Sequence, residues 1–335
     1  MIEDHSKPPT VLQVALALGA VYILWGSTYL AIAVAIETIP PLLMAGVRYL
    51  IAGAILYGWS RWRGAPRPSR IHWRSALLVG GFLLLGGNGA LVWAEQKLPT
   101  GTAALLVSTM PLWMVLLGWL RPGGTRPSWK VFAGVGLGLA GLALLVRPTA
   151  SPQDTHIDIV GAVVLVLGAM SWAWGSIRSR EIPLPESPLL ATAMEMLSGG
   201  ALLVLGGAVL GEASQVHLAE ITLRSALGLV YLITFGALIG FTAYVWLLRR
   251  VASPVLVGTY AYINPIVAVF LGWLFLSEPL TGRTLIAAAV IISGVVLITL
   301  SRRAPAPAQP AALPAQKEET LSLNDSRTAA CRLPG

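Results

Sequence analysis

Long apolar runs separated by short polar gaps occupy almost the whole chain. The ten runs are residues 11–36, 41–60, 74–94, 100–120, 129–147, 157–177, 188–211, 224–248, 254–276 and 283–301. A run of about 20 apolar residues crosses the roughly 30 Å hydrocarbon core of a bilayer as a helix. None of the runs shows the every-second-residue alternation of a transmembrane β-strand. The pattern predicts an all-α integral membrane protein with ten transmembrane helices.

Composition supports this class and argues against others. Apolar residues make up 56% and charged residues 11% of the 335 residues, and the mean hydropathy is +0.74. A soluble domain carries about 25% charged residues to cover its surface, and the gaps here are too short to hold such a domain. The first run is far longer than the apolar core of a signal peptide and lacks a clear basic start. We therefore expect it to be a membrane span.

Lys and Arg, the source of the net charge of +8, gather in every second gap. With the N-terminus in the cytoplasm, the cytoplasmic side receives Arg61, Arg63, Arg67, Arg70, Arg74, Arg121, Arg126, Lys130, Arg178, Arg180, Arg249, Arg250, Arg302 and Arg303. The opposite side receives only Lys97, Arg147, Arg224 and Arg283. Cytoplasmic loops are enriched in Lys and Arg, so the charges independently predict ten spans with both termini cytoplasmic. No basic platform remains for nucleic acid, whose binding depends on many phosphate contacts.

The same pattern divides the chain into four parts. We expect residues 1–10 to be a cytoplasmic tail, 11–147 a first five-helix unit, 157–301 a second five-helix unit, and 302–335 a cytoplasmic tail. The last part is rich in Ala and Pro and then polar, so it cannot bury a core and is expected to be disordered.

Matched residues on corresponding helices indicate that the two units are copies. Pro111 followed by Gly118-Trp119-Leu120 recurs with the same spacing as Pro265 followed by Gly272-Trp273-Leu274. Further matches, all at offsets of 149 to 154 residues, are Trp25-Gly26-Ser27 with Trp174-Gly175-Ser176, Trp93 with Trp246, and Gly141 with Gly294. Several matches in the same order indicate an internal repeat.

The odd number of helices in each unit makes the repeat an inverted one. The second unit must enter the membrane upside-down relative to the first. Inverted repeats are typical of secondary transporters, whose site lies between the two halves near the bilayer midplane. The sequence therefore predicts two inverted five-helix repeats around a central site for a small-molecule substrate.

Several motifs resemble those of the drug/metabolite transporter superfamily, in particular its EamA group of ten-helix bacterial carriers. They are Trp25-Gly26-Ser27, Ala45-Gly46-Val47-Arg48, Gly87-Asn88-Gly89, Ala94-Glu95-Gln96, Val107-Ser108-Thr109-Met110-Pro111 and Tyr262-Ile263-Asn264-Pro265. The resemblance covers about residues 14–301. It implies a secondary carrier of the bacterial inner membrane, an exporter of amino acids or related metabolites, with multidrug efflux as the alternative within the same fold.

Two charged residues lie inside predicted spans and occupy equivalent positions of the repeat, Arg48 and Glu195. A charge at the centre of a membrane helix costs about 2.5–3.5 kcal/mol on insertion scales, so it is retained for a reason. The functional interpretation is that Arg48 binds a substrate carboxylate, while Glu195 binds an amine or a coupling proton. The alternative is a structural ion pair between the two halves.

Asn88 and Glu95 share one face of the third predicted span by helical spacing. Asn88 lies between two glycines that allow close helix contact, and its amide either faces the cavity or finds a partner elsewhere. Glu95 lies near the external end of the span, and we interpret it as a loop or headgroup-level residue beside Lys97.

Paired helix breaks in equivalent positions are the best sequence-level indication of a transporter site. Pro111 and Pro265 each lack an N–H and clash with the preceding turn, which frees carbonyl groups near Ser108 on one helix and near Tyr260 and Asn264 on the other. We expect these residues to line the site; the alternative is a static kink in each helix.

Aromatic residues fall into two groups. Trp59, Trp62, Trp73 and Trp129 lie at the ends of runs, as expected for an interfacial belt. Trp25, followed by Ser27, and Trp172 lie deeper in the first and sixth runs. These are candidates for the wall of a site for an organic or cationic substrate, with ordinary packing as the alternative.

No enzymatic, metal-binding or cofactor motif is found. The four histidines, His5, His72, His156 and His217, and the single cysteine, Cys331, lie in loops or tails. Without an ATP-binding motif, transport would use an ion gradient, with protons as the candidate coupling ion, or the substrate's own gradient. A membrane enzyme or a receptor is less favoured because the spans hold no catalytic cluster and the loops are short. Small-residue motifs, Gly134-x-x-x-Gly138 and Ala289-x-x-x-Ser293, could join helices of the bundle or of a homodimer.

Overall fold

The computed structural model describes residues 9–124, 126–146, 157–251, 254–257 and 259–301. Within these ranges the chain forms helices and no strands. Nine of the described helical stretches are long and apolar enough to cross a membrane, and Tyr260–Leu276 is a shorter apolar helix. The sequence-based prediction of an all-helical membrane protein is therefore confirmed. The predicted tails, residues 1–8 and 302–335, lie outside the described residues.

The helices begin and end close to the predicted boundaries. Uninterrupted ones are α1 (Val11–Ala35), α2 (Pro41–Trp62), α7 (Trp129–Val146), α8 (Ile159–Arg178), α9 (Pro188–Val209) and α14 (Gly282–Ser301). Side chains that accept a backbone N–H fix four of the starts, namely Thr10, Ser69, Asp158 and Thr222 before α1, α3, α8 and α10. The third helix begins at Arg70, four residues before the predicted start, because Ser69 caps it.

Two long helices contain a π-helical segment in the middle. The first consists of α3 (Arg70–Gly80), η1 (Gly81–Asn88) and α4 (Gly89–Ala94). The second consists of α10 (Leu223–Tyr231), η4 (Leu232–Ile239) and α11 (Gly240–Arg250). Both π segments are 8 residues long, and they begin 151 residues apart, within the offset range of the sequence repeat. Such segments are rare and frequently mark functional sites.

Two further helices are interrupted. The first stops at the end of α5 (Thr100–Val107) and resumes as α6 (Met110–Leu120). The second has a short α12 (Pro254–Val257) followed by α13 (Tyr260–Leu276). Thr109 and Thr259 lie in these interruptions, and each hydroxyl donates to the carbonyl three residues earlier, at 2.6 Å in both cases. The two interruptions therefore satisfy freed carbonyl groups in the same way.

The position of the second interruption differs from the prediction. Pro111 lies in the first turn of α6, directly after the expected break. Pro265, in contrast, lies within α13, which continues through it. Helix α1 packs closely against α13 around Pro265. A Cβ added to Gly26 of α1 would lie 2.6 Å from Val267 and 3.2 Å from the Asn264 carbonyl. Pro265 thus does not end the helix, and the interruption lies before Tyr260.

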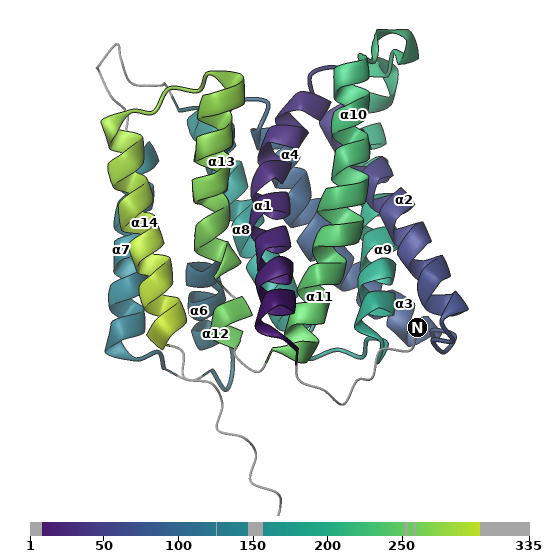
Figure 1. Cartoon of the computed structure of the whole chain (residues 1–335), viewed down its shortest axis with the longest axis horizontal. Helices are drawn as coiled ribbons and strands as arrows, with labels where there is room; N and C mark the ends of the chain where they lie inside the picture. Colours follow the sequence, from purple (N-terminus) through teal and green to yellow (C-terminus); the bar gives the residue numbers. More distant parts are fainter. Residues whose placement is uncertain (1–8, 125, 147–156, 252–253, 258, 302–335) are drawn as a thin grey trace, which may run out of the picture. The chain divides into compact units, whose positions relative to one another are not determined.

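Helices of the two units pack against one another in a reciprocal pattern. Helix α1 packs against α10, η4, α11 and α13, while α8 packs against η1, α4, α5 and α6 (Figure 1). Helix α2 packs against α9, and α7 packs against α14. The first helix of each unit therefore packs against the third and fourth helices of the other unit, and the second and fifth helices each pair with their counterparts.

Glycines allow the closest of these contacts. A Cβ on Gly46 of α2 would lie 2.5 Å from Val204 and 3.0 Å from the Gly200 carbonyl on α9. In the α7–α14 pair, a Cβ on Gly134 would lie 2.8 Å from the Gly294 carbonyl. The predicted close helix contact at Gly134 is thus confirmed, and it joins α7 to α14 of the same chain. The second motif does not contribute, because Ala289 and Ser293 are exposed.

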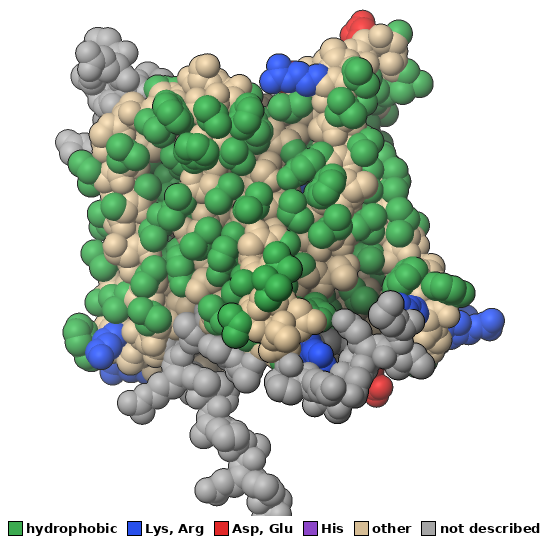
Figure 2. Space-filling model, viewed as in Figure 1, with side chains coloured by type: hydrophobic (Ala, Val, Ile, Leu, Met, Phe, Trp, Pro, Cys, Tyr) green, Lys and Arg blue, Asp and Glu red, His purple; other side chains and the backbone are tan. Residues whose placement is uncertain are grey.

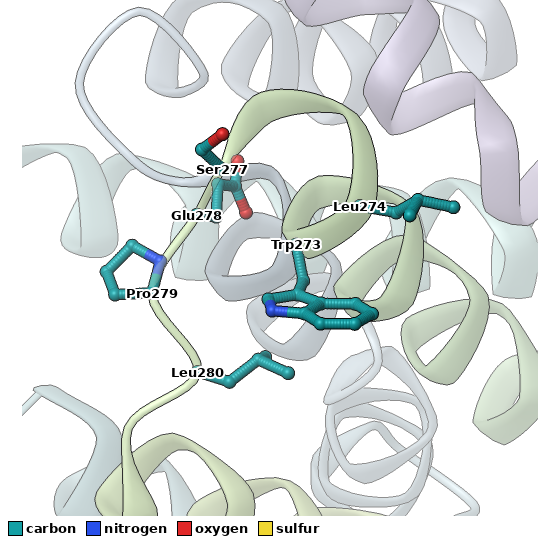
Figure 3. A pocket seen from close by; sticks show the side chains of 6 residues that line it. All are labelled: Trp273, Leu274, Ser277, Glu278, Pro279 and Leu280. Atoms are coloured by element: carbon teal, nitrogen blue, oxygen red, sulfur yellow. The ribbon is translucent and has the colours of Figure 1, made fainter.

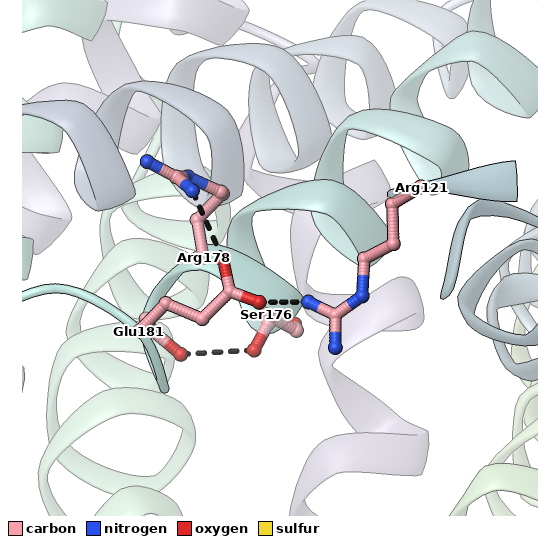
Figure 4. Close-up of polar contacts among 5 residues, drawn as sticks. Arg121, Ser176, Arg178 and Glu181 are labelled. Carbon is pink, nitrogen blue, oxygen red and sulfur yellow. Dashed lines mark hydrogen bonds and ion pairs between the residues drawn. The ribbon is translucent and has the colours of Figure 1, made fainter. Parts of the chain in front are cut away.

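Charged side chains gather near the ends of the helices. Figure 2 shows apolar side chains over the middle of the visible face, with Lys and Arg near its upper and lower margins. We call the end that carries Glu37, Glu95, Glu212 and Glu278 the acidic end, and the end that carries Arg61, Arg121, Arg178 and Glu181 the basic end. At the basic end, Arg121 and Arg178 both pair with Glu181 (Figure 4). Trp62 and Trp129 are exposed there, as expected for interfacial residues.

Candidate functional site

Arg48 is the centre of a buried polar cluster on the acidic half of α2. Its side chain is only 3% exposed, and its guanidinium lies 4.7 Å from the centre of the Tyr49 ring. The guanidinium also approaches η4, since a Cβ on Gly236 would lie 3.2 Å from Nη2. Its Nε and Nη1 groups have no hydrogen-bond partner. Burial of an incompletely paired cation is costly, so this residue meets the usual criterion for a functional charge.

The ion pair between Arg48 and Glu195, which was the alternative to a substrate-binding role, is not formed in the described part of the chain. On α2, the residues that face α9 are Gly46, Leu50 and Gly53. Arg48 lies two positions from Gly46, which is about 200° around the helix, and therefore points away from α9. Glu195 likewise lies two positions from Ala193 and from Leu197, the residues of α9 that face α2, and therefore points away from α2. The repeat makes these positions equivalent, but helical phase turns both charges away from the shared interface.

Glu95, rather than Glu195, is the carboxyl group that interacts electrostatically with Arg48. Its side chain is 7% exposed, and neither carboxyl oxygen has a hydrogen-bond partner. Arg48, Glu278 and Tyr29 are all close enough to interact with it electrostatically. Glu95 lies in the turn that follows α4, as interpreted from the sequence, but its side chain is buried, and the Lys97 ammonium lies 4.6 Å from the centre of the Trp93 ring.

Asn88, the last residue of η1, completes this group. It is buried and lies beside the Tyr49 hydroxyl, and its amide oxygen has no hydrogen-bond partner. We call Arg48, Tyr49, Asn88 and Glu95 the Arg48 cluster. Four buried polar side chains with several unpaired atoms are unusual in a native interior, where most such groups are hydrogen-bonded. Tyr49 gave no signal in the sequence beyond its place next to Arg48.

Trp25 forms the centre of a second, aromatic cluster. Its ring centre lies 5.2 Å from Phe241, 5.1 Å from Tyr244 and 5.2 Å from Tyr260. The indole N–H donates to the Gly236 carbonyl at 3.2 Å. We call these four aromatic residues the Trp25 cluster. Phe241 and Tyr244 follow η4 on the next helix and could not be identified from the sequence, because no motif distinguishes them from other apolar positions.

Two predicted site residues near Trp25, Ser27 and Asn264, form hydrogen bonds with neighbouring helices. Ser27 hydrogen-bonds the Tyr231 hydroxyl at 2.7 Å. With its amide oriented to satisfy both groups, Asn264 donates to the Tyr260 and Tyr22 carbonyls at 3.3 Å each. Tyr260 thus contacts Trp25 directly and Asn264 lies one turn further along α13, whereas Ser27 faces Tyr231 of α10.

The two clusters meet at Gly236, in the middle of η4. Its carbonyl accepts the Trp25 indole N–H, and the position of its missing side chain faces Nη2 of Arg48 and the methyl of Thr28. A glycine is required here, because any side chain would displace one of these groups. The π segment thus places a glycine at the junction of a cationic and an aromatic surface.

The remaining predicted site residues lie elsewhere. Ser108 is buried, and its hydroxyl donates to the Leu105 carbonyl at 2.7 Å. Trp172 packs on η1, where a Cβ on Gly87 would lie 2.7 Å from its ring. The structure brings neither of these, nor Glu195, into the two clusters. Each π segment is nevertheless packed against a Trp of the opposite unit.

A hollow of about 380 Å³ opens at the acidic end of α13. Figure 3 shows Glu278 beside Trp273, Ser277 and Pro279 in its wall. None of the predicted site residues lines it. Among the described residues, no group of three or more His, Cys, Asp or Glu side chains is placed to hold a metal ion.

Comparison with known proteins places this arrangement in a family. The model of the EamA-like transporter family matches residues 12–147 and again residues 159–300. The chain belongs to the EamA-like transporter family. The two matches coincide with the two units found by the sequence repeat and confirm the resemblance to drug/metabolite transporters.

EamA-like relatives match nearly the whole chain. The inner membrane transporter YedA of Escherichia coli strain K12 is 39% identical over 287 residues, which cover 85% of this chain and 90% of YedA. Protein PecM of Dickeya dadantii is 30% identical, covering 82% and 88%. A probable amino-acid metabolite efflux pump of Salmonella typhimurium is 28% identical, covering 83% and 91%.

A solved crystal structure shares the EamA-like fold of the chain. It aligns with a TM-score of 0.58 and 22% sequence identity, covering 87% of this chain and 98% of that one. Together with the family match, the apolar helices identify the protein as a membrane transporter.

Proposed function

We propose that the protein is a secondary active transporter that exports small metabolites, amino acids or related compounds, across the bacterial inner membrane by alternating access. The chain would cross the membrane ten times, with α12 and α13 forming one interrupted span and both termini in the cytoplasm. Residues 11–147 and 157–301 would be inverted repeats. Each would pack its first helix against the third and fourth helices of the other.

The observation that carries this proposal is the set of features repeated in both units. The π segments η1 and η4 begin 151 residues apart, and the interruptions at Thr109 and Thr259 lie 150 residues apart. Inverted repeats with discontinuous helices support alternating access, because the two units can exchange conformations around a site between them. A static bundle has no need for matched irregular segments.

In the proposed site, Arg48 binds a carboxylate of the substrate and the Trp25 cluster packs against its apolar part. A guanidinium binds carboxylates through strong charge-assisted hydrogen bonds, and Nε and Nη1 of Arg48 have no hydrogen-bond partner. The assignment of the transported class to amino acids agrees with the name of the Salmonella relative, a probable amino-acid metabolite efflux pump. Ser27, Asn88, Tyr260 and Asn264 would complete the walls.

Multidrug efflux is the second candidate, and the Trp25 cluster favours it. Aromatic faces attract a cation that lies within about 6 Å, and the Trp25 cluster brings four aromatic rings together. A carrier of carboxylates should lose binding when Arg48 is changed, whereas a carrier of lipophilic cations should tolerate that change and depend on Trp25.

The proposal can be tested with purified full-length protein. A panel of amino acids, other carboxylates and lipophilic cations is screened by thermal shift, and each hit is tested for counterflow in proteoliposomes. We expect saturable counterflow of at least one carboxylate in wild type and none in Arg48→Met. Binding and exchange of no small molecule would contradict a carrier function. Gel filtration in nanodiscs would also establish whether the transporter is a homodimer.

A further inference from the structure

At the acidic end, Glu278 binds the N-terminus of α5. Its carboxylate accepts the backbone N–H of Thr100 at 2.6 Å and that of Gly101 at 3.2 Å. Glu278 belongs to the second unit and α5 to the first, so this contact joins the two halves of the transporter. A carboxylate is well suited to the positive end of a helix. We call the contact between Glu278 and α5 the Glu278 latch.

Glu95 lies next to the latch with an unpaired carboxyl group. Only a short turn, from Glu95 to Pro99, separates it from the start of α5. Both of its oxygens are buried and lack a hydrogen-bond partner, although a buried carboxylate is stable only when it is paired and hydrogen-bonded. A bound proton removes this conflict, because the neutral acid is much less costly to bury.

The charged and titratable groups around Glu95 come from every neighbouring element. Arg48 on α2 attracts its carboxylate, whereas Glu278, after α13, repels it, and Tyr29 on α1 adds a hydroxyl. In its own turn, Lys97 is held over Trp93. Asp158, at the start of α8, is occupied with capping that helix. Burial raises the pKa of the Glu95 carboxyl well above its usual range, Glu278 raises it further, and Arg48 lowers it.

Building on the transport function proposed above, we propose that Glu95 is a proton-binding site of the transporter and that its proton holds the Glu278 latch closed. With Glu95 neutral, Glu278 can remain on the α5 N-terminus. When Glu95 loses its proton to water, two carboxylates face each other in a poorly solvated region. Nearby like charges disfavour each other, so Glu278 leaves the N-terminus of α5 and the acidic end opens.

The proton on Glu95 can be observed without any substrate. Infrared difference spectra of the protein in nanodiscs, recorded over a pH titration, detect the carbonyl stretch of a protonated carboxylic acid. The spectra are recorded in a Glu195→Gln background, which removes the other carboxyl that lies within a span away from water. In this background we expect a band that persists near neutral pH, is lost in Glu95→Gln and remains in the exposed control Glu220→Gln. We also expect Glu278→Gln to lower the midpoint of the band, because a repelling charge has been removed.

The state of the latch can be read from a buried thiol. In a Cys331→Ser background, Thr100→Cys places a thiol behind Glu278, and labelling by a maleimide is normalised to the exposed Gln96→Cys. The normalised rate should rise with pH through the Glu95 midpoint. It should be low and flat in Glu95→Gln, and high at every pH in Glu278→Gln.

Three outcomes would overturn the proposal. They are survival of the band in Glu95→Gln, an unchanged midpoint in Glu278→Gln, and a pH-dependent labelling rate of Thr100→Cys that persists when Glu95 is replaced. None of these measurements needs a transported compound. Failure of the metabolite screen with an intact proton band would therefore contradict the proposed function, and the reverse result would contradict only the proton-linked latch.

Discussion

Replacement of Arg48 by Met should stabilise the fold while it abolishes transport. Met has a similar length and leaves no unpaired donor in the Arg48 cluster. A charge at the centre of a span costs about 2.5–3.5 kcal/mol on insertion scales. The contact with the Tyr49 ring returns about 0.5–2 kcal/mol of this. The net gain from the substitution is therefore about 0.5–3 kcal/mol, in line with the general result that buried ions can be replaced by apolar residues.

The assay is thermal unfolding of the purified protein in one detergent, with Arg121→Met as the matched control. Arg121 is an exposed residue of the basic end that pairs with Glu181. Exposed ion pairs contribute about 0–1 kcal/mol, so this control should be unchanged or slightly destabilised. A lower midpoint for Arg48→Met than for wild type would refute the reasoning, because Arg48 would then be a structural residue whose partners stabilise the fold.

Two further predictions concern contacts between the halves. Glu212 is buried and accepts two backbone N–H groups at the start of α2, at 3.2 and 2.9 Å, so Glu212→Ala should cost about 1.5–3 kcal/mol. The exposed neighbour Glu220, changed to Ala, should leave the melting temperature unchanged. Gly46→Ala brings a methyl to 2.5 Å from Val204 and should destabilise the α2–α9 pair by about 1–3 kcal/mol. Gly58→Ala on the same helix, with open space around it, should be neutral or stabilising; equal effects of the two glycine changes would contradict the packing account.

Much of the fold follows from hydropathy because the bilayer selects apolar stretches of one length. The boundaries were predicted within a few residues, and the repeat was visible in Pro, Gly and Trp positions that packing requires. The π segments could not be predicted, because 232–239 reads as an ordinary apolar run and only tertiary contacts around Trp25 and Gly236 distinguish it. The short helix before Tyr260 was missed for the same reason.

The site was predicted in part. Trp25 and Tyr260 are in contact, because α1 packs against α13, whereas Ser27 faces Tyr231 on α10. Of the two interpretations of Arg48 and Glu195, the structural ion pair is not formed, because equivalence in a repeat does not fix the direction in which a side chain points around its helix. The burial of Glu95 could not be predicted, because proximity to a span end suggests exposure and only tertiary packing buries this turn residue.

Uptake into inside-out membrane vesicles tests the central claim most directly. Wild type and Arg48→Met are compared in the presence of a metabolite mixture, and the vesicle contents are quantified by mass spectrometry. The account predicts that wild type accumulates one or more small carboxylates such as amino acids, and that the folded and stable Arg48→Met protein does not. Equal accumulation by the two proteins, or accumulation by neither, would contradict a carrier whose site contains Arg48.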